Sequence, residues 1–205
     1  KHDQNHVLAD CARAAGRLDK AVGGAVEALE QGDVDRATAL LRWAKSVASR
    51  TATIRETLGI AHYTAARYSE AHSELLAYRR MSGKHDQNHV LADCARAAGR
   101  LDKAVAYVEE MTAAGVDPAR VAEGVMVLAG ARADANDLEG ALQTLERLGL
   151  DPEEIQPWHP RVWYLAADLS ERLGRTSDAR DYFEAITAVD DDFGDVAERL
   201  GRLDS

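Results

Sequence analysis

The chain has 205 residues, of which 46% are hydrophobic and 29% charged, a balance typical of folded globular proteins rather than of disordered tails or collagen-like polymers. Its 35 acidic side chains outnumber the 25 basic ones, and the formal net charge of −10 argues against broad binding to the phosphate backbone of nucleic acids. Its apolar runs fall short of the roughly 18 residues that a membrane-spanning helix needs, so no membrane partner is expected.

The N-terminal segment is an internal duplication. Residues 1–22 read KHDQNHVLADCARAAGRLDKAV, and the same letters recur at 84–105 without a difference. The first copy runs into Gly23-Gly24, a pair that costs about 1 kcal/mol per residue inside a helix and therefore predicts a junction. We expect a duplicated helical segment at 1–24, followed by a repeat array at 25–205. An unbroken identity inside a divergent chain favours deliberate engineering over natural duplication.

The cysteines and the first residues bear on location. Cys11 and Cys94 are one position counted twice, so they predict no disulfide framework and favour a reducing compartment. The first residues lack the basic start and apolar stretch of a secretory signal. We therefore expect a cytoplasmic protein.

A second periodicity runs through the rest of the chain. A small residue is followed, five positions later, by alanine, and the starts are 34, 33, 37 and 38 residues apart. The five pairs are Gly32/Ala37, Ala66/Ala71, Gly99/Ala104, Asn136/Ala141 and Gly174/Ala179. Apolar residues recur at helical spacing on both sides of each pair, and the two-residue alternation of strands is absent. The pattern predicts about a dozen helices of 12–16 residues in antiparallel pairs.

Turn residues mark the expected helix ends. Gly115 and Gly149 each precede an Asp-Pro pair, an order typical of a helix end followed by a capped helix start at Asp117-Pro118 and Asp151-Pro152. Asp33 and Ser177 are expected to cap second helices by accepting bonds from free backbone N–H groups.

With these features the chain resembles the tetratricopeptide-repeat (TPR) family. That family places small residues at positions 8 and 20 of a 34-residue hairpin and a bulky residue at position 24. Position 8 is held by Gly59, Ala92, Ala129 and Ala167, and position 24 by Leu41, Leu75, Val108, Leu145 and Phe183. The resemblance implies an all-α, right-handed solenoid of helical hairpins, a TPR-like superhelix. The Ala- and Arg-rich composition resembles that of actinobacterial members of the family.

The resemblance also implies a binding surface, because the first helix of each TPR repeat lines a concave groove. Carried over to this chain, the groove residues expected to contact a partner are Glu56, Ile60, Tyr63, His89, Asp93, Arg96, Met126, Tyr164 and Asp168. This mixture suits an extended or helical peptide with apolar anchors and some basic groups. The Lys and Asn pair with which some family members hold a C-terminal carboxylate is missing here. We therefore expect a non-enzymatic scaffold for a peptide or protein partner, with no cofactor.

Three alternatives stay open. The chain could be an engineered or rearranged repeat protein with no cellular partner of its own. The duplicated segment could form a homodimer by packing on another molecule. Finally, His85, His89 and Asp93, which repeat His2, His6 and Asp10, would share one helix face at i, i+4, i+8 spacing and could hold zinc for a metal-dependent activity.

Two side-chain types have a structural and a functional interpretation. Cys94 is expected to be a small packed residue rather than a nucleophile, since a reactive thiol needs a cationic, partly exposed setting. Trp163 falls at a bulky packing position of the repeat and is expected in the core. Trp158 lies in the preceding connection, where it fits either a cap over the previous repeat or an exposed anchor.

Overall fold

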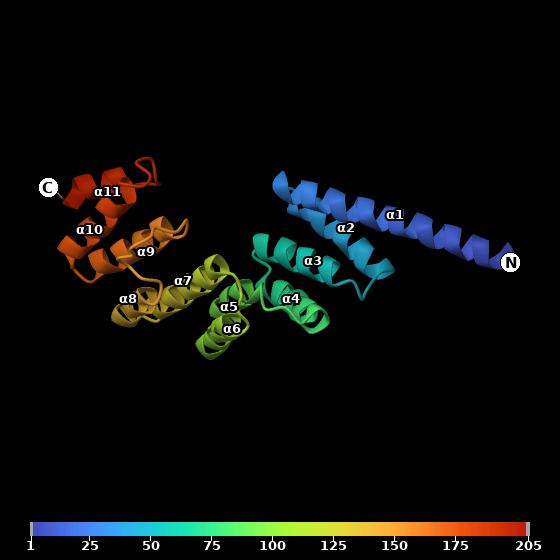
Figure 1. Cartoon of the computed structure of the whole chain (residues 1–205), viewed down its shortest axis with the longest axis horizontal. Coiled ribbons are helices and arrows are strands. Elements are labelled where there is room, and N and C mark those ends of the chain that lie inside the picture. Colours follow the sequence, from blue (N-terminus) through green and yellow to red (C-terminus); the bar gives the residue numbers. More distant parts are fainter. Residues whose placement is uncertain (1, 204–205) are drawn as a thin grey trace. The chain divides into compact units, whose positions relative to one another are not determined.

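The computed structural model describes residues 2–203, and side chains from residue 14 onward. Within this range the chain is all-α and contains no strand. Figure 1 shows the helices, whose bounds are α1 His2–Glu30, α2 Val34–Val47, α3 Ala52–Thr64, α4 Tyr68–Ser82, α5 Asn88–Ala97, α6 Leu101–Ala113, α7 Pro118–Asp134, α8 Leu138–Glu146, α9 His159–Arg172, α10 Thr176–Thr187 and α11 Val196–Leu203. The predicted all-α hairpin fold is confirmed, although the helix lengths range from 8 to 29 residues rather than 12 to 16.

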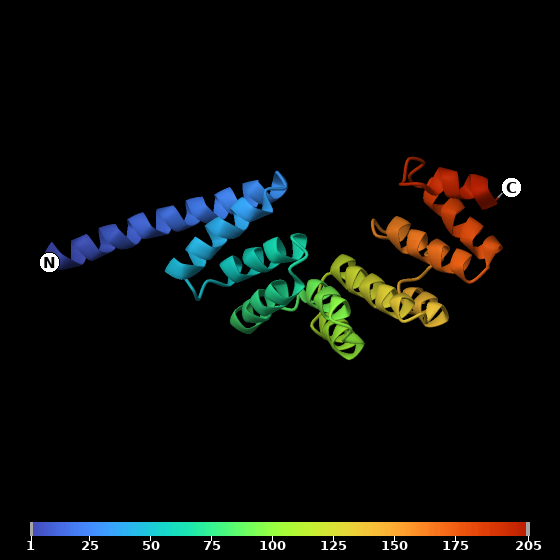
Figure 2. The same cartoon turned by 180° about the vertical axis from the view of Figure 1, so that it is seen from behind.

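The chain divides into two compact units, Lys1–Cys94 and Ala95–Ser205. In the first unit, α1 pairs with α2 and α3 pairs with α4, and α2 also packs on α3. In the second unit, α7 pairs with α8 and α9 with α10, while α6 contacts α7 and α10 contacts α11. The antiparallel course of these hairpins is visible in Figure 2.

The five predicted turn residues all have left-handed backbones. Their φ angles are +76° for Gly32, +56° for Ala66, +68° for Gly99, +62° for Asn136 and +73° for Gly174. In every case the next residue donates its N–H to a carbonyl five residues back, as in Arg67 N to His62 O at 2.8 Å. This bond is the Schellman closure of a helix end, which requires a left-handed residue just before the donor. The periodicity in the sequence is therefore a periodicity of turns.

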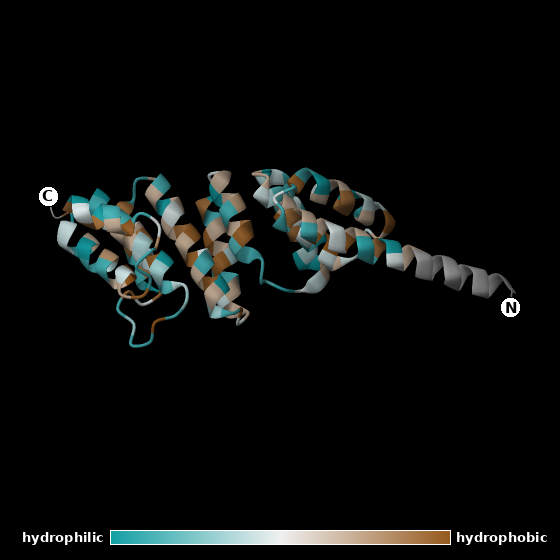
Figure 3. Ribbon diagram, turned by 90° about the horizontal axis from the view of Figure 1, so that it is seen from above, coloured by the Kyte–Doolittle hydropathy of each residue, from teal (hydrophilic) through white to brown (hydrophobic). Residues whose placement is uncertain are grey.

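Each hairpin is closed by a small and a bulky side chain on its second helix. The alanines that follow the turns, Ala37, Ala71, Ala104, Ala141 and Ala179, are all fully buried. So are the bulky residues four positions further on, Leu41, Leu75, Val108, Leu145 and Phe183. The small residues let paired helices approach, and the bulky ones fill the remaining space. Figure 3 shows that hydrophobic and hydrophilic residues are interspersed along the coloured helices, as expected of helices that each pack one face on a neighbour.

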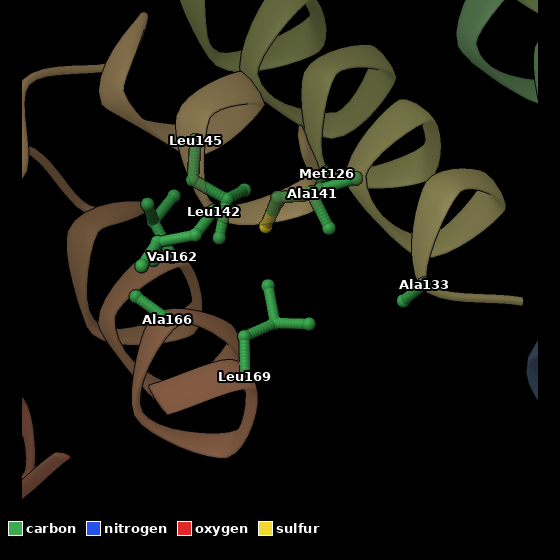
Figure 4. Packing of buried hydrophobic residues seen from close by; sticks show 9 residues of the cluster. Met126, Ala133, Ala141, Leu142, Leu145, Val162, Ala166 and Leu169 are labelled. Carbon is green, nitrogen blue, oxygen red and sulfur yellow. The ribbon is translucent and has the colours of Figure 1, made fainter. Parts of the chain in front are cut away.

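One core cluster in the second unit shows how neighbouring hairpins join. Met126 of α7, Leu142 and Leu145 of α8, and Val162 and Leu169 of α9 pack together (Figure 4). Trp158 and Leu165 lie against the same cluster as partly buried neighbours. Three helices thus share one apolar core, so removing either hairpin would expose the other.

The duplicated segment folds differently in its two positions. In the second copy the chain leaves α5, turns at left-handed Gly99 and enters α6. In the first copy the equivalent Gly16 lies inside α1, which continues without interruption to Glu30. The helix also passes through Gly23-Gly24 (Figure 1), so the expectation of a break at this pair is wrong. The division of the chain at residue 24 itself stays a prediction.

The capping predictions divide evenly. Asp33 caps α2 by accepting a bond from Arg36 N at 3.0 Å, and Asp117 caps α7 by accepting from Ala119 N at 2.9 Å, with Pro118 in the first turn. Ser177 is not a cap, because α10 already begins at Thr176. Pro152 does not start a helix either. The chain stays irregular until α9 begins at His159.

Candidate protein-interaction face

The side chains predicted to line a groove lie on α3, α5, α7 and α9, and most are held by bonds between consecutive odd-numbered helices. We call this surface the first-helix face and describe it separately in each unit. In the first unit, Tyr63 Oη donates to Asp93 Oδ2 at 2.6 Å, and Gln87 Nε2 donates to Glu56 Oε1 at 2.8 Å. Both bonds join α3 to α5 or the residue just before it. They fix two carboxylates beside Ile60 and His89 on a partly exposed surface.

The Tyr63 phenol is held in its protonated form. Burial, reinforced by the hydrogen bond to Asp93 and by its negative charge, raises the pKa of the Tyr63 phenol well above its ordinary value. The phenol therefore remains a donor throughout the physiological range. A carboxylate can accept several bonds at once, so the bond from Tyr63 does not by itself close Asp93 to a partner.

In the second unit, the odd-numbered helices are joined by arginine–carboxylate pairs instead. Arg96 Nη1 donates to Asp134 Oδ2 at 2.9 Å, and Arg161 donates to the Glu123 carboxylate from both terminal nitrogens, Nη2 at 3.0 Å from Oε2. These pairs join the end of α5 to α7, and α7 to α9. The Asp134 side chain is still 65% exposed, so it can accept bonds from a partner as well. At such exposure the pairs contribute little to stability and chiefly position the charges.

A more buried cluster fastens α11 to α9. Tyr164 Oη donates to Asp195 Oδ1 at 2.7 Å, and Arg199 Nη2 donates to Asp168 Oδ1 at 3.0 Å and also contacts Glu171. The Arg199 guanidinium lies 5.3 Å from the Tyr164 ring centre and 4.9 Å from that of Phe183. Burial alone would lower the pKa of Arg199, but its bonds to Tyr164, Glu171 and Asp168 outweigh burial and raise it.

The structure brings two of the predicted site residues together in a hydrogen bond, Tyr63 with Asp93. Arg96, Tyr164 and Asp168 instead pair with residues that lie 31 to 38 positions later in the chain, namely Asp134, Asp195 and Arg199. Met126 is 9% exposed and belongs to the core, so its side chain does not line this face. Asp195 and Arg199 were missed because they follow the last recognisable turn. Each lies 31 residues after its partner, Tyr164 or Asp168, which is close to one repeat length, and this spacing is the sequence signal that could have identified them.

The predicted zinc trio is not assembled, and the metal-dependent alternative built on it is not supported. Helix α5 begins at Asn88, so His85 lies in the preceding loop and the i, i+4, i+8 spacing does not apply. Asp93 accepts the bond from Tyr63. Among the described side chains, no group of three or more His, Cys, Asp and Glu residues could hold a metal ion. The copied trio, His2, His6 and Asp10, lies outside the described side chains.

The other residues singled out in the sequence, Cys94, Trp163 and Trp158, have packing roles. Cys94 is 2% exposed, and burial raises the pKa of its thiol to about 12, so it is not a thiolate nucleophile at neutral pH. Trp163 is buried as predicted and donates to Leu150 O at 2.8 Å. Trp158 partly covers the core of the preceding hairpin, which favours the cap over the exposed anchor. None of the described helices combines the length and apolarity needed to cross a bilayer.

The comparisons with known proteins agree with this geometry. The family model for the tetratricopeptide repeat matches residues 89–155, from within α5 to the loop after α8. No curated protein sequence matches the chain.

Several solved structures share the fold. A putative kinesin light chain from Podosopora anserina, with nearly identical TPR-like repeats, is similar at a TM-score of 0.64 and 18% identity, over 84% of this chain and 94% of that one. PilF from Pseudomonas aeruginosa has a TM-score of 0.65 and 17% identity, over 85% and 77%. YrrB, described as a TPR protein with an unusual peptide-binding site, has a TM-score of 0.56 and 16% identity, over 89% and 90%. At these identities the likeness concerns the fold, and the chain is therefore an all-α protein of TPR-like helical hairpins whose residues 89–155 match the TPR family.

Proposed function

We propose that the chain is a non-enzymatic scaffold that binds a peptide or protein segment on its first-helix face. The observation that carries the proposal is the series of bonds between consecutive odd-numbered helices, such as Tyr63–Asp93 and Arg161–Glu123. Each bond holds a side chain in one orientation while leaving part of it exposed. A partner then meets a surface whose polar groups are already positioned, which lowers the entropic cost of binding.

The charges on this face suggest the chemistry of the partner. Within the first unit, Glu56 and Asp93 lie near Ile60 and Tyr63, and in the second unit the side chains of Asp134 and Glu123 are partly exposed. A segment with Lys or Arg side chains and an apolar anchor would complement such a surface. The likeness to YrrB, whose description includes a peptide-binding site, supports a peptide as the partner. A cytoplasmic location and the absence of catalysis remain parts of this proposal.

A selection from a randomised peptide library on the immobilised chain tests the proposal. We expect enriched peptides to carry basic residues and an apolar anchor. The variant Glu56→Ala/Ile60→Ala, whose two changes both lie on α3 in the first unit, should lose most of this binding, because it removes one partly exposed carboxylate and one apolar side chain. Glu109→Ala, which changes the charge equally at an exposed position on α6, serves as the matched control.

Two results would speak against the first-helix face. One is a selection that enriches no peptide above an unrelated helical protein. The other is equal binding of the enriched peptides by the parent chain and by Glu56→Ala/Ile60→Ala.

A further inference from the structure

An apolar groove lies between α1 and α2, and none of its lining residues belongs to the first-helix face. It has a volume of about 660 Å³. It is lined by five small or apolar residues and four charged ones: Ala21, Gly23, Gly24, Leu40 and Trp43, with Arg17, Lys20, Glu27 and Arg36. Trp43 is 41% exposed, and Val47, one turn further along α2, is 50% exposed. A tryptophan this exposed beside an apolar groove is typical of a contact residue rather than of a solvated surface.

The surroundings of Gly23 and Gly24 in the groove lining do not explain why these two residues are glycine. A Cβ on Gly23 would meet nothing within 4 Å, and one on Gly24 would make an ordinary contact of 3.5 Å with Leu40 Cδ1. Alanine would fit at both positions and would favour the helix. The two residues that follow the second copy of the duplicated sequence, at the corresponding positions, are Ala106 and Tyr107. Glycine in mid-helix is explained when another backbone approaches closely.

The charges on the groove side of α1 are arranged symmetrically about this pair. Lys20 precedes Gly23 by three residues, and Glu27 follows Gly24 by three residues, and both line the groove. If two α1 helices cross antiparallel at their glycine pairs, Lys20 of each lies opposite Glu27 of the other. Arg17 then lies near the C-terminal turn of the opposite helix, where the carbonyl groups favour a cation. A contact of this kind is self-complementary, as a two-fold dimer requires.

We propose that the groove between α1 and α2 is a homodimer interface, whose occupant is α1 of a second copy of this chain. The two helices cross at Gly23-Gly24, Trp43 of each copy covers the α1 of the other, and two Lys20–Glu27 pairs set the antiparallel direction. This surface is distinct from the first-helix face, so dimerisation and peptide binding are separable. A dimer would present two copies of that face at once.

The first test is sedimentation equilibrium of the full chain. We expect a reversible monomer–dimer equilibrium. Gly23→Ala/Gly24→Ala should weaken dimerisation about tenfold or more while raising the melting temperature of the monomer, because the added methyl groups favour the helix and separate the crossing backbones. A purely structural role of the glycines would not produce these opposite signs. Trp43→Ser should weaken dimerisation as well, and Trp43 provides a fluorescence signal for the same equilibrium.

The second test reverses the charges. Lys20→Glu and Glu27→Lys should each weaken the homodimer, because like charges then face each other. An equimolar mixture of the two variants should form a heterodimer with the parent affinity, since both pairs are restored. Lys103→Glu is the matched control, because Lys103 occupies the same place in the second copy and is exposed on α6. It should leave dimerisation unchanged.

The proposal is overturned by a chain that remains monomeric at every attainable concentration. It is equally overturned by a dimer that Gly23→Ala/Gly24→Ala, Trp43→Ser and Lys20→Glu all leave unaffected, since the interface would then lie elsewhere. A mixture of Lys20→Glu and Glu27→Lys that fails to associate would reject the antiparallel crossing.

Discussion

Gly59 on α3 lies directly against Leu75 on α4, so that a Cβ on Gly59 would fall 2.6 Å from Leu75 Cγ. Both residues are buried, and the Leu75 side chain has no room to withdraw. Gly59→Ala should therefore destabilise the chain by about 1–3 kcal/mol, although alanine is the better helix former. Urea unfolding followed by circular dichroism measures the change. Gly201→Ala, at a helical glycine with nothing within 4 Å, should be neutral or stabilising.

The turn between α3 and α4 contains a strained residue. Ala66 has a φ of +56°, a left-handed conformation that costs an L-residue with a Cβ about 1 kcal/mol. Ala66→Gly should raise the free energy of unfolding by up to about 1 kcal/mol. Its effect is reduced by the greater freedom of glycine in the unfolded chain. The reverse change at an equivalent turn, Gly99→Ala, should lower stability by a similar amount. A change of stability in the same direction for both substitutions would contradict the left-handed turns.

His62 makes the stability of the first unit dependent on pH. Its side chain is 3% exposed, and burial, together with the charges of Arg42 and Arg67, lowers its pKa below 6.5 despite Glu70 and Glu74. The unfolded chain therefore binds the proton first as pH falls. The contribution of His62 is complete above pH 6.5 and declines as pH falls from there toward the folded-state pKa. Unfolding measured from neutral to mildly acid pH should show this loss, and His62→Gln should flatten it.

Arg199 holds the C-terminal helix. Its side chain is only 11% exposed and bonds to Asp168 while lying over the Tyr164 and Phe183 rings. Arg199→Ala should lower stability by about 1–3 kcal/mol because Asp168 and Glu171 lose a partner in a half-buried site. Amide exchange within α11 should accelerate more than exchange within α7. Arg202→Ala, an exposed change on the same helix, is the control, and equal acceleration by both variants would argue against an anchoring role.

The parts of the fold that follow from local chemistry could be predicted. A left-handed turn favours Gly, Asn or a small residue, and close helix packing favours alanine five residues later. Both requirements restrict the residue type at a fixed position, so both are visible in the sequence. The interaction face was only partly predictable, because Asp195 and Arg199 reach Tyr164 and Asp168 through the tertiary fold rather than through any repeat motif. The prediction of a zinc site at His85, His89 and Asp93 was wrong because α5 begins only at Asn88, and the tertiary surroundings rather than the spacing of these residues set that start.

The duplicated segment shows a limit of another kind. Gly99 turns the chain in the second copy, whereas Gly16, with the same fifteen residues before it and the same six after it, continues a helix in the first. The local preference of glycine for a turn amounts to about 1 kcal/mol, which the neighbouring elements can outweigh.

That difference has a consequence for how arrays of this kind grow. The first copy of the repeated sequence lengthens α1 and forms no hairpin of its own. Counting hairpins by sequence identity alone would therefore give one too many. A repeated segment in such an array therefore supplies a helix, and the elements that flank it decide whether that helix bends into a new hairpin.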